Sequence, residues 1–408
     1  MNAFNEELIS RLGDLREQNL FRELRRVDSP QSPHLEIDGR KFLNFSSNDY
    51  LGLANEPALK DAAIEAIERF GAGAGASRLI CGSMGPHQEL DERIAAFKGT
   101  QAALSFSSGY AAILGIIGSL LDSNDVIVLD KLVHASIVDA ARLCGAKVRV
   151  FGHNNLNDLE KILRWADNRH ATPAIVQTDR KPRTLIVTES VYSMDGDQAP
   201  LRDLVELKEK HGAWLMVDEA HATGLYGKSR RGLAEKLEVA SRIQIQMGTL
   251  GKALGSAGGY VCGPRSLIEY LINRARPFVF STAPVPAAAA AATAGIRFVQ
   301  SAAGAERCQK LWSNIEAFVD GGDARKKPDA TERRHKQSAI IPIMIGDEAK
   351  ALKISAALRE QGIFIPAIRY PTVGHGQARL RVTLSAAHEP ADLDRLRDAL
   401  HAALTLHP

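Results

Sequence analysis

The chain has 408 residues, of which 45% are hydrophobic and 24% are charged, a composition typical of a folded globular protein. This length predicts two or three domains and allows a large buried core. The net charge of +3, with acids and bases interspersed, argues against nucleic acid or a membrane surface as the main partner.

Other features of the composition narrow the class of protein further. The longest apolar stretch, residues 111–121, is far shorter than the roughly 20 residues that a membrane span needs. The first residues show neither the basic nor the apolar region of a secretory signal. Four scattered cysteines form no C-x-x-C pair, and the histidines form no H-E-x-x-H spacing, so we expect no disulfide framework and no metal site. A cytoplasmic protein is the expectation.

The N-terminal region predicts a helix followed by a hairpin. Leucine and isoleucine residues recur at helical spacing over residues 5–26, which predicts an amphipathic helix that ends before Pro30. Residues 34–45 alternate around Asp38-Gly39, the dipeptide typical of a tight hairpin turn.

The central region predicts one large α/β domain. A helix over residues 57–70 is followed by the glycine-rich residues 71–78, which lack the pattern of a P-loop or of a dinucleotide fingerprint. Helices and short apolar strands then alternate, which indicates a largely parallel sheet covered on both faces. The helices are expected at residues 86–98, 109–121, 135–143, 156–166 and 201–211, and the strands at 101–106, 126–129, 147–150, 184–187 and 213–217.

In the C-terminal region the predicted strands and helices no longer alternate as they do in the central region. Residues 319–337 are polar and charged and predict a surface excursion. Strands at 339–345, 364–365 and 378–384 and helices at 348–361 and 390–404 indicate a smaller α+β domain, packed with the N-terminal hairpin. The predicted domains are an N-terminal segment over 1–55, a large α/β domain over 56–300 and a C-terminal α+β domain over 301–408.

Several predicted strands end abruptly in polar side chains. Asp218 and His221 follow one strand, Lys252 lies in a glycine-rich turn after the next strand, and His134 follows a third. The carboxyl ends of parallel strands meet at one edge of a sheet, so we expect these side chains to converge. In Ser107-Ser-Gly-Tyr a glycine opens a helix after a strand, which favours a bound anion such as phosphate.

Together these groups match the requirements of a pyridoxal 5′-phosphate (PLP) site. The lysine would attach the cofactor, and the aspartate would keep the pyridine nitrogen protonated. Each residue also has a structural alternative. Asp218 could cap a helix, His134 and His221 could be structural, and Thr249 and Ser193 could be turn residues. The combination is more specific than any of its members.

Stretches along nearly the whole chain resemble the α-oxoamine synthase family of PLP enzymes. The resemblance is carried by Asn44-Phe-Ser-Ser-Asn-Asp-Tyr-Leu-Gly-Leu, Ser193-Met-Asp-Gly-Asp, Val217-Asp-Glu-Ala-His, Gly248-Thr-Leu-Gly-Lys, Phe280-Ser-Thr-Ala-Pro and Ala378-Arg-Leu-Arg-Val-Thr-Leu-Ser-Ala-Ala-His. It implies the aspartate-aminotransferase-like fold of type I PLP transferases, with a seven-stranded, mainly parallel sheet in the large domain and a smaller α+β domain.

The resemblance also implies a role for individual residues. Lys252 would carry the cofactor and move the substrate Cα proton, Asp218 would pair with the pyridine nitrogen, and His134 would stack on the ring. The remaining cofactor contacts would come from His221 and Ser193 to the phenolic oxygen, from Gly109, Tyr110 and Thr249 to the phosphate, and from Ser281 and Thr282 to the phosphate of a neighbouring subunit. Asn48 and Arg381 would hold the amino-acid carboxylate, and Arg25 and Thr372 would line the acyl side.

The implied activity is that of an acyltransferase that condenses an amino acid with an acyl thioester and releases CO2. Ala367-Ile-Arg-Tyr-Pro-Thr-Val resembles the members that join L-alanine to pimeloyl-CoA or pimeloyl-carrier protein in biotin biosynthesis, as homodimers with shared sites. Alternatives within the family use glycine with acetyl-CoA or serine with a long acyl-CoA. An aldolase, an aminotransferase or a non-catalytic relative are further alternatives. His375 and residues 319–337 match nothing in the family pattern.

Overall fold

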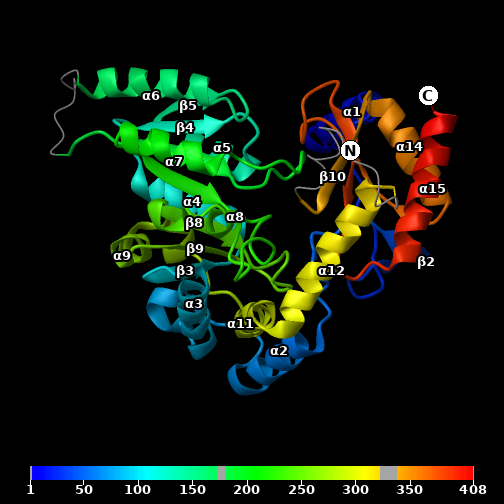
Figure 1. The fold of residues 1–408 in the computed structure, drawn as a ribbon, viewed down its shortest axis with the longest axis horizontal. Helices are drawn as coiled ribbons and strands as arrows, with labels where there is room; N and C mark the ends of the chain where they lie inside the picture. The colour runs from blue at the N-terminus through cyan, green and yellow to red at the C-terminus, as the bar shows by residue number, and fades with distance from the viewer. Residues whose placement is uncertain (1, 172–179, 322–337, 408) are drawn as a thin grey trace. The chain divides into compact units, whose positions relative to one another are not determined.

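The computed structural model describes residues 2–171, 180–321 and 338–407, and the chain divides into two compact units (Figure 1). The first unit consists of Met1–Gly52, Met194–Gly196 and Gln309–Pro408, and the second of Leu53–Ser193 and Asp197–Cys308. The three domains expected from the sequence stay a prediction. In the described part of the chain, no helix is both long and apolar enough to cross a membrane.

The second unit is built on a seven-stranded sheet in the order β3-β9-β8-β7-β6-β4-β5. Among these strands β9 runs antiparallel to both of its neighbours, and the other pairs are parallel. The predicted seven-stranded, mainly parallel sheet is therefore confirmed. Its strands are β3 (Ala102–Phe106), β4 (Val126–Asp130), β5 (Lys147–Phe151), β6 (Thr184–Glu189), β7 (Trp214–Asp218), β8 (Ile245–Thr249) and β9 (Gly259–Gly263).

The central strands form because their apolar runs are covered on both sides. Every residue of β4 and of β6 is buried, as expected for parallel strands between two helical layers. Helices flank the sheet in Figure 1. They are α2 (Pro57–Phe70), α3 (Gly85–Lys98), α4 (Gly109–Leu120), α5 (Ala135–Leu143), α6 (Leu156–Ala171), α7 (Leu201–Lys210), α8 (Leu233–Lys236), α9 (Arg265–Arg274), α10 (Arg276–Val279) and α11 (Pro286–Gln300), with a π-helix at Arg78–Gly82 and a 3₁₀ turn at Ala240–Arg242.

A large hydrophobic core lies between this sheet and the helices α4 and α5. Ile116 and Ile117 of α4 and Ile137 of α5 are fully buried against Ile127 of β4 and Leu185 of β6. Burial of each such side chain contributes about 1.5–3 kcal/mol. The core therefore fixes the strand ends that carry the candidate site.

The first unit contains two three-stranded sheets, with orders β1-β2-β11 and β10-β13-β12. Asp38 (φ 50°) and Gly39 (φ 72°) form the turn between β1 and β2, which confirms the predicted hairpin. Strand β11 pairs with β2, so the N-terminal hairpin and the C-terminal segment share one sheet. The elements are α1 (Ala3–Glu17), β1 (His34–Ile37), β2 (Arg40–Asn44), α12 (Ala302–Val319, which begins in the second unit), β10 (Ile340–Gly346), α14 (Glu348–Glu360), β11 (Ile363–Phe364), β12 (Ala367–Ile368), β13 (Ala378–Thr383) and α15 (Pro390–Leu406).

The predicted helix over residues 5–26 is wrong in its second half. Helix α1 ends at Glu17, and Asn19 adopts a left-handed conformation with φ 56°. The backbone N–H groups of Leu20 and Phe21 both donate to the carbonyl of Leu15, which closes the helix in the manner of a C-terminal cap. The apolar spacing continued to Leu20, but the turn at Asn19 redirects the chain.

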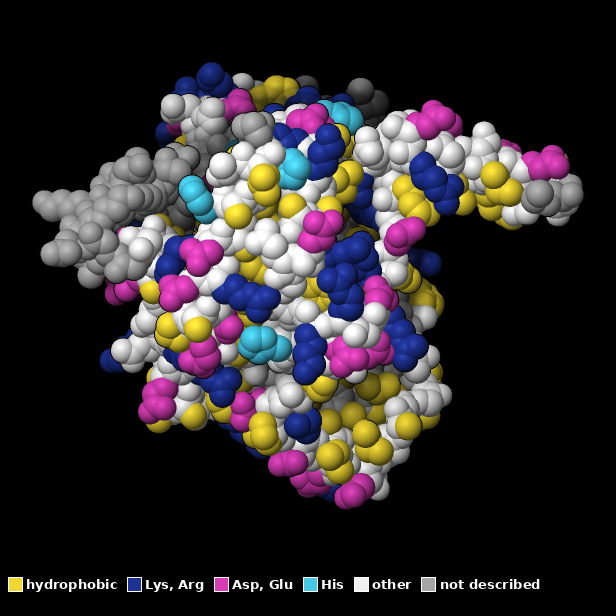
Figure 2. Space-filling view, turned by 90° about the vertical axis from the view of Figure 1, so that its right-hand side faces the viewer, with side chains coloured by type: hydrophobic (Ala, Val, Ile, Leu, Met, Phe, Trp, Pro, Cys, Tyr) yellow, Lys and Arg dark blue, Asp and Glu magenta, His cyan; other side chains and the backbone are white. Residues whose placement is uncertain are grey.

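Two further observations concern the surface. Of the charged segment expected at residues 319–337, positions 322–337 lie outside the described residues. Figure 2 shows acidic and basic side chains interspersed over the visible face, without a large field of one sign. This mixture agrees with the small net charge of the sequence.

Candidate active site

The candidate site lies in the second unit, at the carboxyl ends of β4, β6, β7 and β8. Asp218 is the last residue of β7, and Glu189 is its register partner at the end of β6. His134 follows β4, and Lys252 follows β8. The parallel strands bring these ends to one edge of the sheet, which is where α/β folds bind ligands.

Lys252 lies in direct contact with His221. The distance between Lys252 Nζ and His221 Nε2 is 2.7 Å, and His221 is buried. The turn that holds the lysine closes through a bond from the backbone N–H of Gly255 to the carbonyl of Lys252. Gly255 has φ +69°, and a Cβ atom there would lie 2.6 Å from Leu53, so only glycine allows the turn to pack this closely.

Asp218 and Glu189 are two buried carboxyl groups side by side. Burial raises the pKa of Asp218, and the positive charge of Lys252 opposes that rise. Burial raises the pKa of Glu189 well above its usual value, and the negative charge of Asp218 adds to this effect. Lys252 lowers the pKa of both groups, but the pKa of Glu189 is raised further by its neighbour, so Asp218 ionises at a lower pH than Glu189.

His134 connects the end of β4 to helix α5. It is the N-cap residue of α5, and its Nδ1 accepts a bond from the backbone N–H of Ser136 and lies 2.7 Å from the Ser136 hydroxyl. More than a third of its surface is exposed, yet neighbouring atoms desolvate the imidazole enough to lower its pKa. A neutral ring held by one nitrogen is suited to stacking on a flat ligand.

The start of helix α4 offers a cradle for an anion. Ser108 caps the helix through a bond from the Ala111 N–H to its hydroxyl, and Gly109 is the first helical residue. A Cβ atom at Gly109 would lie 2.8 Å from Thr249 Cγ2, and one at Gly259 would lie 2.5 Å from Gly109. Glycines therefore let two strands approach the helix N-terminus, where free N–H groups favour negative charge.

These residues fit PLP on observations of the structure itself. The hydroxyl oxygen of Thr249 is buried and makes no hydrogen bond within the described residues, and it borders the cradle at Gly109. A buried carboxyl group, a lysine and an imidazole lie at the same edge of the sheet. The phosphate, the pyridine nitrogen and the aldehyde of PLP would each meet a matching group.

The other residues expected around a cofactor are also in the second unit. Ser193 is buried. Tyr110 donates its hydroxyl to Asp139 at 2.6 Å, so its side chain is tied to α5 and only its backbone faces the cradle. Ser281 and Thr282 are exposed, and Thr282 forms a β-bridge with Ser77.

Four predicted substrate residues lie in the first unit instead. Arg381 is buried and donates to Asn48 Oδ1 at 3.1 Å and to the Thr383 hydroxyl at 2.9 Å. Arg25 and Thr372 both line one pocket, but Thr372 accepts a bond from Arg22 at 3.3 Å rather than from Arg25. The structure thus places Asn48 next to Arg381, and it places Arg25 and Thr372 in the same pocket.

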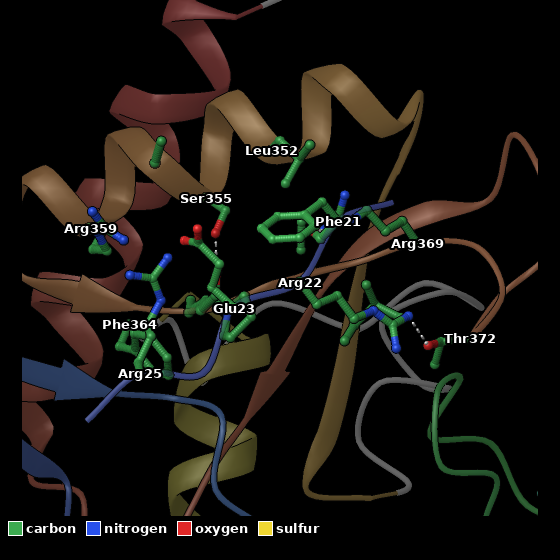
Figure 3. A pocket seen from close by; sticks show the side chains of 15 residues that line it. Phe21, Arg22, Glu23, Arg25, Leu352, Ser355, Arg359, Phe364, Arg369 and Thr372 are labelled. Atoms are coloured by element: carbon green, nitrogen blue, oxygen red, sulfur yellow. Dashed lines mark hydrogen bonds between the residues drawn. The ribbon is translucent and has the colours of Figure 1, made fainter. Parts of the chain in front are cut away.

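The pocket around Arg25 and Thr372 has a volume of about 620 Å³ (Figure 3). Apolar side chains such as Phe21, Leu352 and Phe364 form part of its wall. Four arginines also line it, and none of them forms an ion pair with a carboxylate in the described residues; they are Arg22, Arg25, Arg359 and Arg369. Arg369 donates to the carbonyl of Phe21 at 3.0 Å. One carboxylate, that of Glu23, also lines the pocket, so the four arginines outnumber the acidic groups in it. A cavity with part of its wall apolar and an excess of guanidinium groups suits an amphiphilic anion.

Sequence reasoning missed several groups around the site. Glu189 lies just after the strand expected at 184–187, where nothing in the local pattern marks it as part of a site. Lys98 forms a buried ion pair with Glu219, the residue after Asp218. Burial alone would lower the pKa of Lys98, but the carboxylate of Glu219 raises it, so the lysine stays charged. No local sequence pattern predicts this ion pair, because its two residues are 121 positions apart.

Comparisons with known proteins agree with this geometry. The model of the aminotransferase class I and II family matches residues 40–400. The chain is 47% identical to 8-amino-7-oxononanoate synthase of Geotalea daltonii, over 98% of this chain and 97% of the relative. The chain belongs to the α-oxoamine synthase family.

Solved structures show the same family in three dimensions. A serine palmitoyltransferase from S. paucimobilis, with PLP and myriocin bound, superposes with a TM-score of 0.88 at 31% identity, covering 100% of this chain and 99% of that one. An 8-amino-7-oxononanoate synthase from Francisella tularensis gives 0.73 at 28% identity, covering 90% and 98%.

The two kinds of likeness point to different members of the α-oxoamine synthases. The serine palmitoyltransferase superposes with a higher TM-score than the oxononanoate synthase of Francisella tularensis, whereas the oxononanoate synthase of Geotalea daltonii has a higher sequence identity than the serine palmitoyltransferase. The backbone is shared across the family, and side chains decide which substrate is accepted. Sequence identity is therefore the better guide to activity. The predicted fold and the expected PLP chemistry are confirmed by these relatives.

Proposed function

We propose that the chain catalyses the PLP-dependent, decarboxylating condensation of L-alanine with a pimeloyl thioester, giving 8-amino-7-oxononanoate, CO2 and a free thiol. The observation that carries the proposal is the contact of Lys252 with His221 beside the buried Asp218, in a chain 47% identical to a named oxononanoate synthase. The product is an intermediate of biotin biosynthesis.

Bound PLP supplies an electron sink for the charge that develops at the alanine Cα atom. The protein residues provide the rest. Lys252 would hold the cofactor until the amine of alanine takes its place. The freed lysine amine would then remove and return the proton at Cα, which needs a base of lowered pKa. Asp218, as a carboxylate, keeps the pyridine nitrogen protonated, while the neutral Glu189 adds no competing charge.

The remaining cofactor residues have positioning roles in this proposal. His134 stacks against the ring, and His221 and Ser193 bond the phenolic oxygen. The backbone N–H groups of Gly109 and Tyr110 hold the phosphate, and the buried hydroxyl of Thr249 gains the partner that it lacks within the described residues. Satisfying that hydroxyl favours the loaded enzyme.

Arginine side chains are proposed to recognise both substrates, the amino acid and the acyl thioester. Arg381, held by Asn48, is proposed to bind the alanine carboxylate. Arg25 and Thr372 are proposed to bind the acyl substrate. A pimeloyl chain ends in a free carboxylate, which the arginines of the pocket would neutralise. Acetyl and palmitoyl chains carry no such charge, so the pocket favours the pimeloyl donor over these alternatives.

A second copy of the chain is proposed to complete the site. Ser281 and Thr282 are exposed, and the β-bridge between Ser77 and Thr282 links them to the π-helix that follows Ser77. Large apolar side chains are exposed on both segments, among them Ile80 at 80% and Phe280 at 72%. Such a patch is typical of an interface, and it supports a homodimer in which these hydroxyls reach the partner's phosphate.

A substrate panel tests the proposal. The purified holoenzyme is given L-alanine, glycine or L-serine with pimeloyl-, acetyl- or palmitoyl-CoA, and with pimeloyl-carrier protein. We expect the highest kcat/KM for alanine with a pimeloyl thioester. A higher value for glycine with acetyl-CoA or serine with palmitoyl-CoA would replace the proposal by that alternative.

The four free cysteines fit the reducing cytoplasm, where we place the reaction.

A further inference from the structure

A cluster of titratable side chains beside the candidate site has no role in the proposed function. His153 follows β5, and its two ring nitrogens contact two carboxylates. Nδ1 lies 3.0 Å from Asp130 Oδ1, and Nε2 lies 2.8 Å from Asp197 Oδ2. Asp130 ends β4, whereas Asp197 lies 67 positions further along the chain.

Each carboxylate belongs to a segment that carries a cofactor residue. The buried Asp130 accepts the backbone N–H of Leu132 at 2.8 Å and so shapes the four residues that lead to His134. The carbonyl of Asp197 accepts the backbone N–H of Tyr192 at 3.0 Å, which closes the loop around Ser193. His153 joins these two segments through its ring. The next residue, Asn154, also contacts both, because its backbone N–H donates to Asp130 Oδ2 at 2.9 Å and its amide donates to Asp197 Oδ2 at 3.2 Å.

The bridge requires a positively charged imidazole. An ionised carboxylate only accepts hydrogen bonds, so both ring nitrogens must donate. Burial would lower the pKa of His153, but its bonds to Asp130 and Asp197 raise it to about 10. The ring also packs edge-on against Tyr192, with centroids 4.4 Å apart. Charge, geometry and packing all hold the imidazole between the two segments.

We propose that His153 is a positioning residue of the cofactor site, which holds His134 and Ser193 in place by bridging Asp130 and Asp197. This inference rests on the proposed function. Without the imidazolium, only the neutral donors of Asn154 would lie between the two carboxylates, and the uncompensated repulsion would push the segments apart. The residue would therefore control how PLP is bound without touching it.

The test compares PLP binding in variants of the full chain. H153Q can donate to only one carboxylate at a time. In the double variant H153Q/D197N, the two amides can donate to Asp130 and to each other, so the bridge is restored without charge. H211Q is the matched control, because His211 contacts Asp167 at 2.6 Å just before β7, at the opposite end of the strands. The readouts are the PLP Kd of the apoprotein, the circular dichroism of bound PLP and the Tm of the apoprotein.

We expect H153Q to raise the PLP Kd by about tenfold, as for the loss of one charged hydrogen bond, and to change the dichroism of the bound ring. H153Q/D197N should recover most of that loss, and H211Q should lower Tm alone. A Kd and dichroism in H153Q within twofold of wild type, with only Tm reduced, would overturn the inference.

Two further outcomes keep the test decisive. If H153Q does not fold, D197N alone serves, because it weakens the bridge at the half-exposed carboxylate; an unchanged Kd and dichroism in D197N would then refute the role. A wild-type protein that binds no PLP would refute the proposed function, whereas normal PLP binding in both wild type and H153Q would refute only this inference.

Discussion

Lys252 Nζ and His221 Nε2 are 2.7 Å apart, at the edge of the sheet where β7 and β8 both end. An ammonium group can only donate, so His221 accepts at Nε2 whenever Lys252 is protonated. The buried imidazole thus offers a place for the lysine proton to be shared. Asp218 supplies the negative charge that keeps a cation at this edge.

The charge of Asp218 should matter far more than that of its neighbour Glu189. D218N places a neutral amide where a carboxylate would keep the pyridine nitrogen protonated, so we expect kcat to fall about 100-fold or more. E189Q is the matched control, because its register partner is Asp218 and its raised pKa already keeps it neutral. We expect E189Q to retain most of its activity. Similar losses in the two variants would contradict the assignment.

The glycine at the start of α4 should be required for cofactor affinity. In G109A the new Cβ atom would lie 2.8 Å from Thr249 Cγ2, a strain of about 1–3 kcal/mol. We therefore expect the PLP Kd to rise at least about fivefold. In G118A, on the same helix, the Cβ atom meets nothing within 4 Å, so affinity should be unchanged and stability should increase slightly. Equal Kd values in the two variants would argue against a cradle at Gly109.

Arg25 should select acyl chains that end in a carboxylate. R25Q removes a guanidinium group from the pocket, and we expect KM for pimeloyl-CoA to rise roughly tenfold or more. The turnover of heptanoyl-CoA, which has the same length without the carboxylate, should barely change. R26Q is a suitable control, because Arg26 pairs with Asp28 and does not line the pocket. The idea fails if R25Q affects both acyl donors alike.

The contribution of His153 to the free energy of unfolding should decrease as the pH rises. Its pKa is raised from 6.5 to about 10 in the folded protein, so its contribution is complete below pH 6.5 and is lost as pH rises through 10. We expect wild type to exceed H153Q in unfolding free energy by about 1–2 kcal/mol at pH 6, allowing for solvent screening, and by almost nothing above pH 10. Urea unfolding at several pH values measures this difference. A gap that stays constant or widens with pH would contradict the charged bridge.

The sequence predicted the parts of the fold that follow from local pattern. The strands of the parallel sheet are apolar because helices cover both faces, and this requirement is visible in runs such as that of β4. The local pattern does not predict strand β9, because the strand begins and ends with glycine and a further glycine precedes it. Glycine weakens a strand pattern. Helix α1 was predicted too long because apolar spacing does not report the left-handed residue Asn19.

The site shows the same division between local and long-range information. Lys252, Asp218 and His221 were found because each follows a strand in a recognisable motif. His153 was missed because its partners, Asp130 and Asp197, are distant in the chain and only the folded sheet brings them together. The arginines around the pocket likewise come from segments more than 300 positions apart, so no sequence window contains them.

The measurement that tests the central claim most directly is the stoichiometry of the reaction with carboxyl-labelled L-alanine and pimeloyl-CoA. We predict equal amounts of labelled CO2, free CoA and 8-amino-7-oxononanoate from wild type, and from K60A as a surface-lysine control. K252A should form none of them and should lack the visible absorbance of lysine-bound PLP. Release of CoA without CO2, or transfer of the amino group with neither product, would contradict the account.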